Sequence, residues 1–265
     1  MGNFAEVARA EVNISNGTVG ASFDANNGST VNVSGGSVGN SFDANSGSTV
    51  NISGGSVGVA FDANNGSTIN ISAGDVGTFF RANDGSTVNI SGGEVGNFFD
   101  ANNGSTVNIS DGTIGSNFDV EDGSTVNILG GSFGNAFEVQ DGGTVNIFGG
   151  SFGVDFDARS GSTVNIFGTE FFLNESLIDA STLGEAFTIF DRGEDLTLSG
   201  LLADGTPFEF NLNPNNTFPF TRDLFESGST LTITRVSSVP EPGCGLTLAT
   251  ISILLLSRRR RQALR

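Results

Sequence analysis

Residues 28–46 read GSTVNVSGGSVGNSFDANS, and residues 47–65 repeat them closely as GSTVNISGGSVGVAFDANN. Around Val31 apolar and polar residues alternate, which predicts a strand with one buried face. Shorter stretches of the same kind surround Val38 and Phe42, and glycines stand at the bends because they accept backbone angles that other residues resist. Each unit therefore predicts three short strands joined by tight corners, and no helix.

The unit recurs every nineteen residues through the first two thirds of the chain. Its inward positions are the columns Val12, Val31, Val50, Ile69, Val88, Val107, Val126, Val145 and Val164; Ile14, Val33, Ile52, Ile71, Ile90, Ile109, Ile128, Ile147 and Ile166; and Phe23, Phe42, Phe61, Phe80, Phe99, Phe118, Phe137 and Phe156. A repeat of this length predicts a solenoid, in which each coil hydrogen-bonds to the next and like side chains stack. We expect an all-β, right-handed parallel β-helix of about nine coils, which at about 4.8 Å per coil is about 43 Å long.

The repeat fails after Phe171, so we divide the chain into a solenoid at 1–169, a β-rich capping module at 170–236 and a tail at 237–265. In the module, two alternating stretches flank Asp204-Gly205, which is a hairpin signal.

The repeats also predict where the module packs. The outward position that is Ser in coils one to six becomes Leu129, Phe148 and Phe167 in the last three. Exposed apolar residues in a row imply a cover, so we expect residues 170–236 to cap the rod end and fold over them. A partner-binding patch is the alternative.

The chain begins inside a coil, because Phe4 lies nineteen residues before Phe23. Residues 1–11 contain no apolar run that would make a signal peptide. We therefore expect that a signal peptide and further coils lie upstream of Met1.

The tail combines three features in a fixed order: Pro240-Glu241-Pro242, an apolar stretch at 243–257, and four consecutive arginines. The stretch is shorter than the ~20 residues of a stable membrane span. The basic end would stay in the cytoplasm and leave the body outside. The basic residues are Arg258, Arg259, Arg260 and Arg261.

This tail resembles the PEP-CTERM sorting signal of Gram-negative bacteria. The resemblance covers residues 239–265 and implies that an exosortase-type membrane protease recognises Pro240, Glu241 and Pro242. It also implies a short hydrophobic helix that holds the protein transiently in the inner membrane, with the body exported to the cell surface or the medium. A plain C-terminal membrane anchor is the alternative.

The composition limits the chemistry of the body. The formal charge is −18, there is no His or Lys, and the single cysteine, Cys244, lies in the tail. An acidic surface repels nucleic acid and anionic lipid, so we expect neither as a partner and contact with the membrane only through the tail. No coil carries a unique cluster of reactive groups, so we expect no enzymatic activity. We expect Arg81, which interrupts a column of Asp, to relieve repulsion between Asp62 and Asp100.

Acidic side chains recur at one corner of the repeat and predict a candidate calcium site. The candidate ligands are Asp24, Asp43, Asp62, Asp100 and Asp119. Stacked carboxylates repel, and oxygen-rich acidic corners suit Ca²⁺. The alternative, which we favour, is that they are turn residues of a solvated corner.

A flat outward face carries Thr and Asn in every coil and predicts a candidate surface-binding array. Its first members are Thr30, Asn32, Thr49, Asn51, Thr68, Asn70, Thr87 and Asn89. Such an array could bind a glycan, a crystal face or ice. The alternative, which we favour, is an Asn ladder whose amides hydrogen-bond from coil to coil.

Together these patterns predict a secreted or surface-bound structural or adhesive protein. A module that binds extracellular polysaccharide is the second interpretation. A β-helix polysaccharide lyase is the third, since that fold also carries enzymes.

Overall fold

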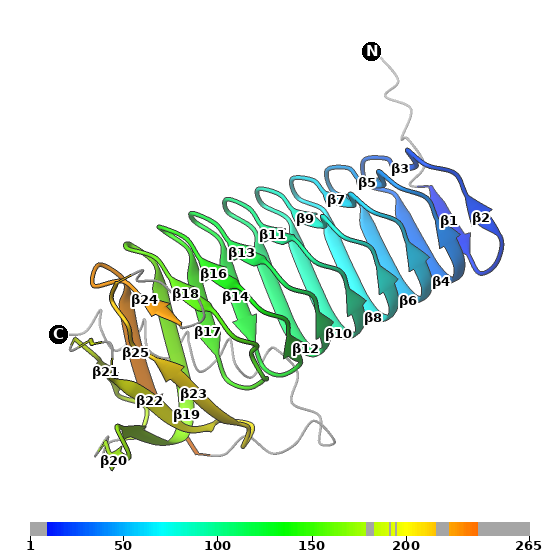
Figure 1. The fold of residues 1–265 in the computed structure, drawn as a ribbon. Coiled ribbons are helices and arrows are strands. Elements are labelled where there is room, and N and C mark those ends of the chain that lie inside the picture. Colours follow the sequence, from blue (N-terminus) through cyan, green and yellow to red (C-terminus); the bar gives the residue numbers. More distant parts are fainter. Residues whose placement is uncertain (1–9, 179–182, 191, 194, 216–222, 238–265) are drawn as a thin grey trace, which may run out of the picture.

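The computed structural model describes residues 10–178, 183–190, 192–193, 195–215 and 223–237, and all of its regular structure is β. Two long sheets wind along one axis and form a rod, with the chain advancing one rung per turn (Figure 1). The β-solenoid predicted from the repeat is therefore confirmed. The predicted sorting residues, the apolar stretch at 243–257 and Phe4 lie outside the described residues.

Before the chain reaches the cap, the larger sheet contains nine parallel strands at successive rungs, which bound eight full turns. These strands are β1 (Glu11–Ile14), β4 (Thr30–Val38), β6 (Thr49–Val57), β8 (Thr68–Val76), β10 (Thr87–Val95), β12 (Thr106–Ile114), β14 (Thr125–Ile128), β17 (Thr144–Ile147) and β19 (Thr163–Leu173). Each residue pairs with the one nineteen positions on, as Val12 does with Val31, so identical side chains stack.

The smaller sheet forms a second wall of the rod, again with one short strand per rung. Its strands are β3 (Asp24–Ala25), β5 (Asp43–Ala44), β7 (Asp62–Ala63), β9 (Arg81–Ala82), β11 (Phe99–Ala101), β13 (Phe118–Val120), β16 (Phe137–Val139), β18 (Phe156–Ala158) and β24 (Leu224–Phe225). The alternation places Asp43 outward and Ala44 inward, as the sequence predicted.

The rungs differ from the expectation of three separate strands. In β4 the first and second strands run on through Gly35 and Gly36, with shifts in register on either side of Ser34. Only the first coil, with β2 (Thr18–Val19), and a later one, with β15 (Ser132–Phe133), keep the second strand separate.

The core is a stack of like side chains along the axis. The Phe42 and Phe61 rings lie 4.7 Å apart at 6°, and the Phe61 and Phe80 rings lie 4.8 Å apart at 11°. The column turns edge-on between Phe118 and Phe137, at 68°. The change coincides with Phe133, which replaces the Val or Ile of earlier coils and packs edge-on against Phe137.

A glycine column lets consecutive coils approach each other closely. A Cβ added to Gly77 would lie 2.7 Å from the carbonyl carbon of Gly58 in the preceding coil. Real Cβ atoms essentially never come that close to a backbone atom, so a side chain at Gly77 would force the two coils apart. Gly20 holds the same position in the first coil and has nothing within 4 Å.

At the C-terminal end the chain leaves the solenoid after β19 and makes an antiparallel cap. The cap contains β20 (Ser176–Leu177), β21 (Ala186–Thr188), β22 (Thr197–Leu202) and β23 (Pro207–Asn211). Strands β22 and β23 form the predicted hairpin around Asp204-Gly205, and β22 pairs with the end of β19.

The chain then rejoins the solenoid, which the sequence analysis missed. Strand β24 pairs in parallel with β18, and β25 (Thr230–Arg235) pairs in parallel with β19 from Thr163↔Thr230 onward. Residues 228–233 read GSTLTI, close to GSTVNI at 161–166, so the repeat returns after the cap. Arg192 fixes this last corner by donating to the carbonyl oxygens of Glu226 (2.5 Å) and Ser229 (2.8 Å).

The cap covers most of the outward apolar row, as predicted. Phe148 and Phe167 stack 4.1 Å apart and are buried beneath Ala203, with Val236 packed alongside. The backbone N–H of Ala203 donates to the carbonyl oxygen of Phe167 at 2.9 Å. Leu129, one coil earlier, lies outside this cluster and is only half-buried.

Candidate functional site

The Thr and Asn face of the larger sheet carries a continuous amide ladder. From Asn32 to Asn165 each side-chain Nδ2 donates to the Oδ1 of the Asn one coil earlier, at distances of 2.7 to 2.9 Å. The ladder ends where the Thr232 hydroxyl donates to Asn165 Oδ1. The favoured interpretation of this face, an Asn ladder, is confirmed.

The ladder occupies hydrogen-bond donors and acceptors that a surface-binding array would need for its ligand. Asn51 both donates to Asn32 and accepts from Asn70, so one donor hydrogen and spare acceptor capacity remain for other contacts. The structure brings the eight predicted array residues together, with Thr49 and Asn51 half-buried on one face. Binding by this face stays a prediction.

The five predicted calcium ligands lie in one column on the outward side of the smaller sheet. Asp24 pairs in register with Asp43, and Asp43 with Asp62; Arg81 then interrupts the column before Asp100. One carboxylate per rung makes a line, whereas Ca²⁺ needs six to eight oxygens in a shell. Within the described residues, no three acidic, His or Cys side chains could hold a metal ion together.

Arg81 acts within this column as the sequence predicted. Its guanidinium lies 3.5 Å from Asp62 on one side and 3.9 Å from Asp100 on the other. Burial raises the pKa of Asp100, while Arg81 acts in the opposite direction and limits the rise. At Asp43, where no Arg stands in the adjacent rungs, burial and repulsion from Asp62 and Asp24 both raise the pKa.

The column is most crowded near the C-terminal end of the rod. Burial raises the pKa of Asp119 to about 6, and the carboxylates of Glu138 and Asp100 contribute by repulsion. Burial also raises the pKa of Asp157 to about 6, although Arg159 opposes the shift. These carboxylates therefore change protonation within a mildly acidic range.

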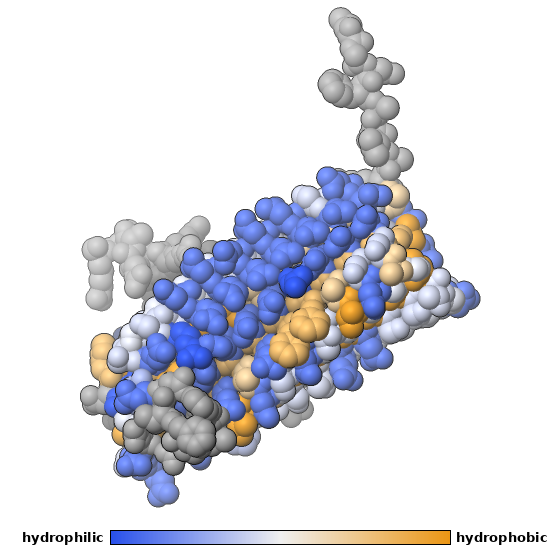
Figure 2. All heavy atoms as spheres, turned by 45° about the horizontal axis from the view of Figure 1, so that its top comes forward, coloured by the Kyte–Doolittle hydropathy of each residue, from blue (hydrophilic) through white to orange (hydrophobic). Residues whose placement is uncertain are grey.

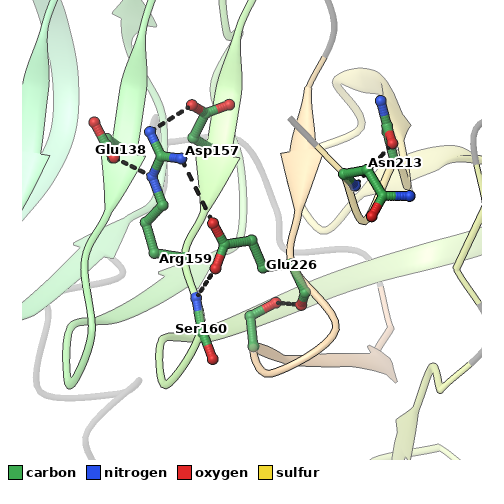
Figure 3. A network of polar contacts seen from close by, with 8 residues as sticks. Glu138, Asp157, Arg159, Ser160, Asn213 and Glu226 are labelled. Carbon is green, nitrogen blue, oxygen red and sulfur yellow. Dashed lines mark hydrogen bonds and ion pairs between the residues drawn. The ribbon is translucent and has the colours of Figure 1, made fainter. Parts of the chain in front are cut away.

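Arg159 joins the last coils of the solenoid (Figure 3). Its guanidinium contacts Glu138, lies 3.2 Å from Asp157 and 3.6 Å from Glu226, which belongs to the rung that follows the cap. The same Glu226 accepts a hydrogen bond from the backbone N–H of Ser160 at 2.8 Å. The sequence analysis did not predict this role of Arg159. The network ties the final rung to the rod.

The third corner of each coil carries a feature that the sequence analysis missed. There the chain adopts positive φ, from 56° to 64°, at residues that are not glycine. They are Ser22, Ser41, Ala60, Phe79, Phe98, Asn117, Ala136 and Asp155. From Ser22 to Ala136 their backbone N–H groups donate forward to the next coil, as Ser41 does to the carbonyl oxygen of Val59 at 2.9 Å. Every one of these corners thus needs a residue in the left-handed backbone conformation, whatever its side chain.

Two of these corners present aromatic side chains to solvent. Phe79 and Phe98 are 46% and 42% exposed, and their rings stack 5.0 Å apart at 9°. Val59, one coil earlier and one residue before the corner, is 40% exposed. We call Val59, Phe79 and Phe98 the aromatic ridge. Apolar side chains form a stripe along this face of the rod, beside a broad hydrophilic face (Figure 2).

The sequence did contain a signal for the ridge. Phe80 and Phe99 belong to the inward Phe column, so the residue before each, Phe79 and Phe98, has to face another way. The other coils have small or polar residues at that position.

Within the described residues there is no helix with the length and hydropathy that a membrane span requires. No family model, no curated protein and no solved structure matches the chain.

Proposed function

We propose that the chain is a non-enzymatic structural or adhesive protein of the cell surface or extracellular matrix, exported and sorted through its C-terminal tail. The observation that carries the proposal is the order Pro240-Glu241-Pro242, a fifteen-residue apolar stretch at 243–257, and four arginines. A stretch shorter than the ~20 residues of a stable span fits transient anchoring before an exosortase-type protease releases the body.

The body suits a structural role because its polar groups are engaged along the rod. The Asn amides hydrogen-bond to one another, and Arg81 and Arg159 pair with the carboxylates of neighbouring rungs. A sequence without His or Lys offers only carboxylates and Arg for acid–base chemistry. A net charge of −18 disfavours nucleic acid and anionic membranes as partners, which leaves neutral polymers and cations.

Cell fractionation tests the sorting proposal. The full chain, preceded by a signal peptide of the host, is expressed in a Gram-negative bacterium with an exosortase-type protease, and the C-terminus of the mature protein is read by mass spectrometry. We expect release to the surface or medium, with the C-terminus near residues 240–242. A triple variant with Pro240→Ala, Glu241→Gln and Pro242→Ala should stay full-length in the membrane fraction.

The matched control is Pro214→Ala, which changes a proline outside the tail. It should be processed like the natural chain. Equal release of the triple variant and the control would contradict the proposal.

Binding of extracellular polysaccharide is a second candidate function. The observation that favours it is the pair of exposed, stacked rings on the aromatic ridge, rather than the Thr and Asn array.

A further inference from the structure

Phe79 and Phe98 occupy a backbone position that is unfavourable for a bulky residue. Both have φ near +60°, where Cβ crowds the following carbonyl, and Asn or Asp tolerates the position far better than Phe. Asn117 and Asp155 hold the same corner in later coils. The choice of Phe therefore works against folding at two successive coils.

Burial does not compensate for this strain. Both residues keep more than two fifths of their surface exposed, whereas Phe80 and Phe99 beside them are almost fully buried. A strained backbone combined with a large exposed apolar side chain indicates a functional role rather than a contribution to the stability of the fold.

The chemistry next to the rings includes hydrogen-bond donors with a fixed direction. Asn97, the residue before Phe98, is exposed, and its Oδ1 accepts the backbone N–H of Ser116 at 2.8 Å. Asn40 holds the same position three coils earlier, and its Oδ1 accepts the backbone N–H of Val59 at 3.1 Å. Because the oxygen is held by the backbone, the amide NH₂ of each Asn is left to donate outward.

The dimensions and the charge of the ridge restrict its ligand. Two rings and a valine make a narrow strip, far less than the ~800 Å² per partner of a stable protein interface. The net charge of −18 disfavours anionic ligands and a second copy of this chain. Beside the ridge, Arg81 pairs with both Asp62 and Asp100. Like positions recur along the axis, so an elongated, neutral ligand fits best.

We infer that the aromatic ridge, with the Asn97 amide, is a binding strip for a neutral polysaccharide laid along the rod. The positively polarised C–H groups of a sugar ring pack against the negative face of an aromatic ring, here against the parts of the two faces that the stacking leaves exposed. The amide NH₂ of Asn97 donates to a sugar hydroxyl. The inference deepens the proposed adhesive role by naming a partner. It rests on the proposed function only in that export would bring the protein to the extracellular polysaccharide.

The test uses the purified full chain on a printed array of neutral polysaccharides, namely glucans, mannans, galactans and N-acetylhexosamine polymers, with alginate as the anionic control. We expect binding to at least one neutral polymer and none to alginate. The double variant Phe79→Asn and Phe98→Asn should weaken that binding roughly tenfold or more, because both rings are lost. Its melting temperature should be equal or higher, since Asn suits the left-handed corner.

Two further variants separate the strip from general surface effects. Asn97→Asp keeps the oxygen that accepts Ser116 N–H but removes the amide donors, so it should weaken binding and leave folding unchanged. Phe190→Asn removes another exposed ring, in the cap, and should bind like the natural chain.

Three results would overturn the inference: no binding to any neutral polymer, binding unaffected by the double variant, or concentration-dependent self-association that the double variant abolishes. Failure of export leaves this measurement intact, because it is made on purified protein. Failure of binding likewise leaves the sorting proposal standing.

Discussion

Phe61 lies between Phe42 and Phe80 with ring centroids 4.7 and 4.8 Å away, and it is completely buried. Its environment is made by copies of itself, so a change at one rung removes contacts on both sides. At outward positions the same stacking is unfavourable unless it is compensated. Each Asp or Asn lies next to an identical side chain, so its charge has to be neutralised or its polar groups hydrogen-bonded. Arg81 and the amide ladder are two solutions to that problem.

Truncation of one core ring should be costly. Phe61→Ala leaves a cavity in a closely packed column, and we expect it to lower the free energy of unfolding by roughly 3–5 kcal/mol. Urea unfolding followed by circular dichroism measures the change. Phe190→Ala, at an exposed ring in the cap, is the control and should change stability little. Equal losses would mean that the column is not the core.

The raised pKa of Asp119 predicts a dependence of stability on pH. The unfolded carboxyl has a pKa of about 3.9, and the folded one about 6. Between these values the folded protein binds a proton that the unfolded chain has released. The contribution of Asp119 to stability is therefore fully present below pH ~4 and is lost as pH rises to about 6.

Asp119→Asn should remove this part of the pH dependence and stabilise the rod at pH 7. The charged groups around it are Glu138, Asp100 and Glu121, which repel it, and Arg159, which attracts it. Urea midpoints between pH 4 and 8 measure the slope. An Asp119→Asn variant with the same slope as the natural chain would refute this assignment.

At the scale of elements, the rung depends on how closely its corners pass over the preceding coil. Gly77 and Gly20 occupy the same place in the repeat, but within the part of the chain that the structure describes, only Gly77 of these two has backbone atoms of an earlier coil against it. The requirement for glycine at this position comes from stacking and not from the rung's own conformation. Comparing the two glycines therefore distinguishes a constraint that arises within one rung from a constraint that arises between neighbouring coils.

Gly77→Ala should therefore destabilise the protein by roughly 1–3 kcal/mol, as overpacking does. Gly20→Ala, with open space around it, should fall within about 0.5 kcal/mol of the natural chain. Thermal or urea unfolding of the pair tests this directly. If both variants lose the same stability, the cost is intrinsic to the rung and the close-approach argument fails.

Most of the elements could be predicted from the sequence because the repeat states the inward positions many times over. Val31, Val33 and Phe42 alternate strictly with polar neighbours, and their columns allow only one register. The left-handed corner was missed because its residue varies from Ser41 to Phe98, so no glycine marks it. The conformation there is imposed by hydrogen bonds to the next coil, which single-residue preferences do not record.

The final rung was missed for a different reason. Strand β25 stacks on β19 although the cap separates them in the sequence, so the regular spacing that identified the earlier coils is lost. Its letters still match, with Gly228 to Ile233 resembling the start of a unit. The contact between Arg159 and Glu226 could not be foreseen without knowing that the two rungs are neighbours.

For the whole molecule, the stacking gives a rod with distinct faces. One face is the amide ladder, another is the acidic column, and the corner between strands carries the aromatic ridge. The cap closes the C-terminal end over Phe148 and Phe167, and the proposed sorting tail follows β25 in the sequence. The stacking therefore presents the same outward side chains at regular intervals along the rod.

The central claim, that every nineteenth residue lies one rung further along the axis, is tested most directly by distances between spin labels. Cys244, the only cysteine, is replaced by Ser, and pairs of labels are placed at Ser46 with Asp122, Asp141 or Ser160, which lie four, five and six rungs away. At about 4.8 Å per rung, pulsed electron paramagnetic resonance should give about 19, 24 and 29 Å, increasing in equal steps. Distances that do not increase from Asp122 to Asp141 to Ser160 would contradict the stacked-rung account. So would steps whose lengths differ by more than the flexibility of the labels can explain.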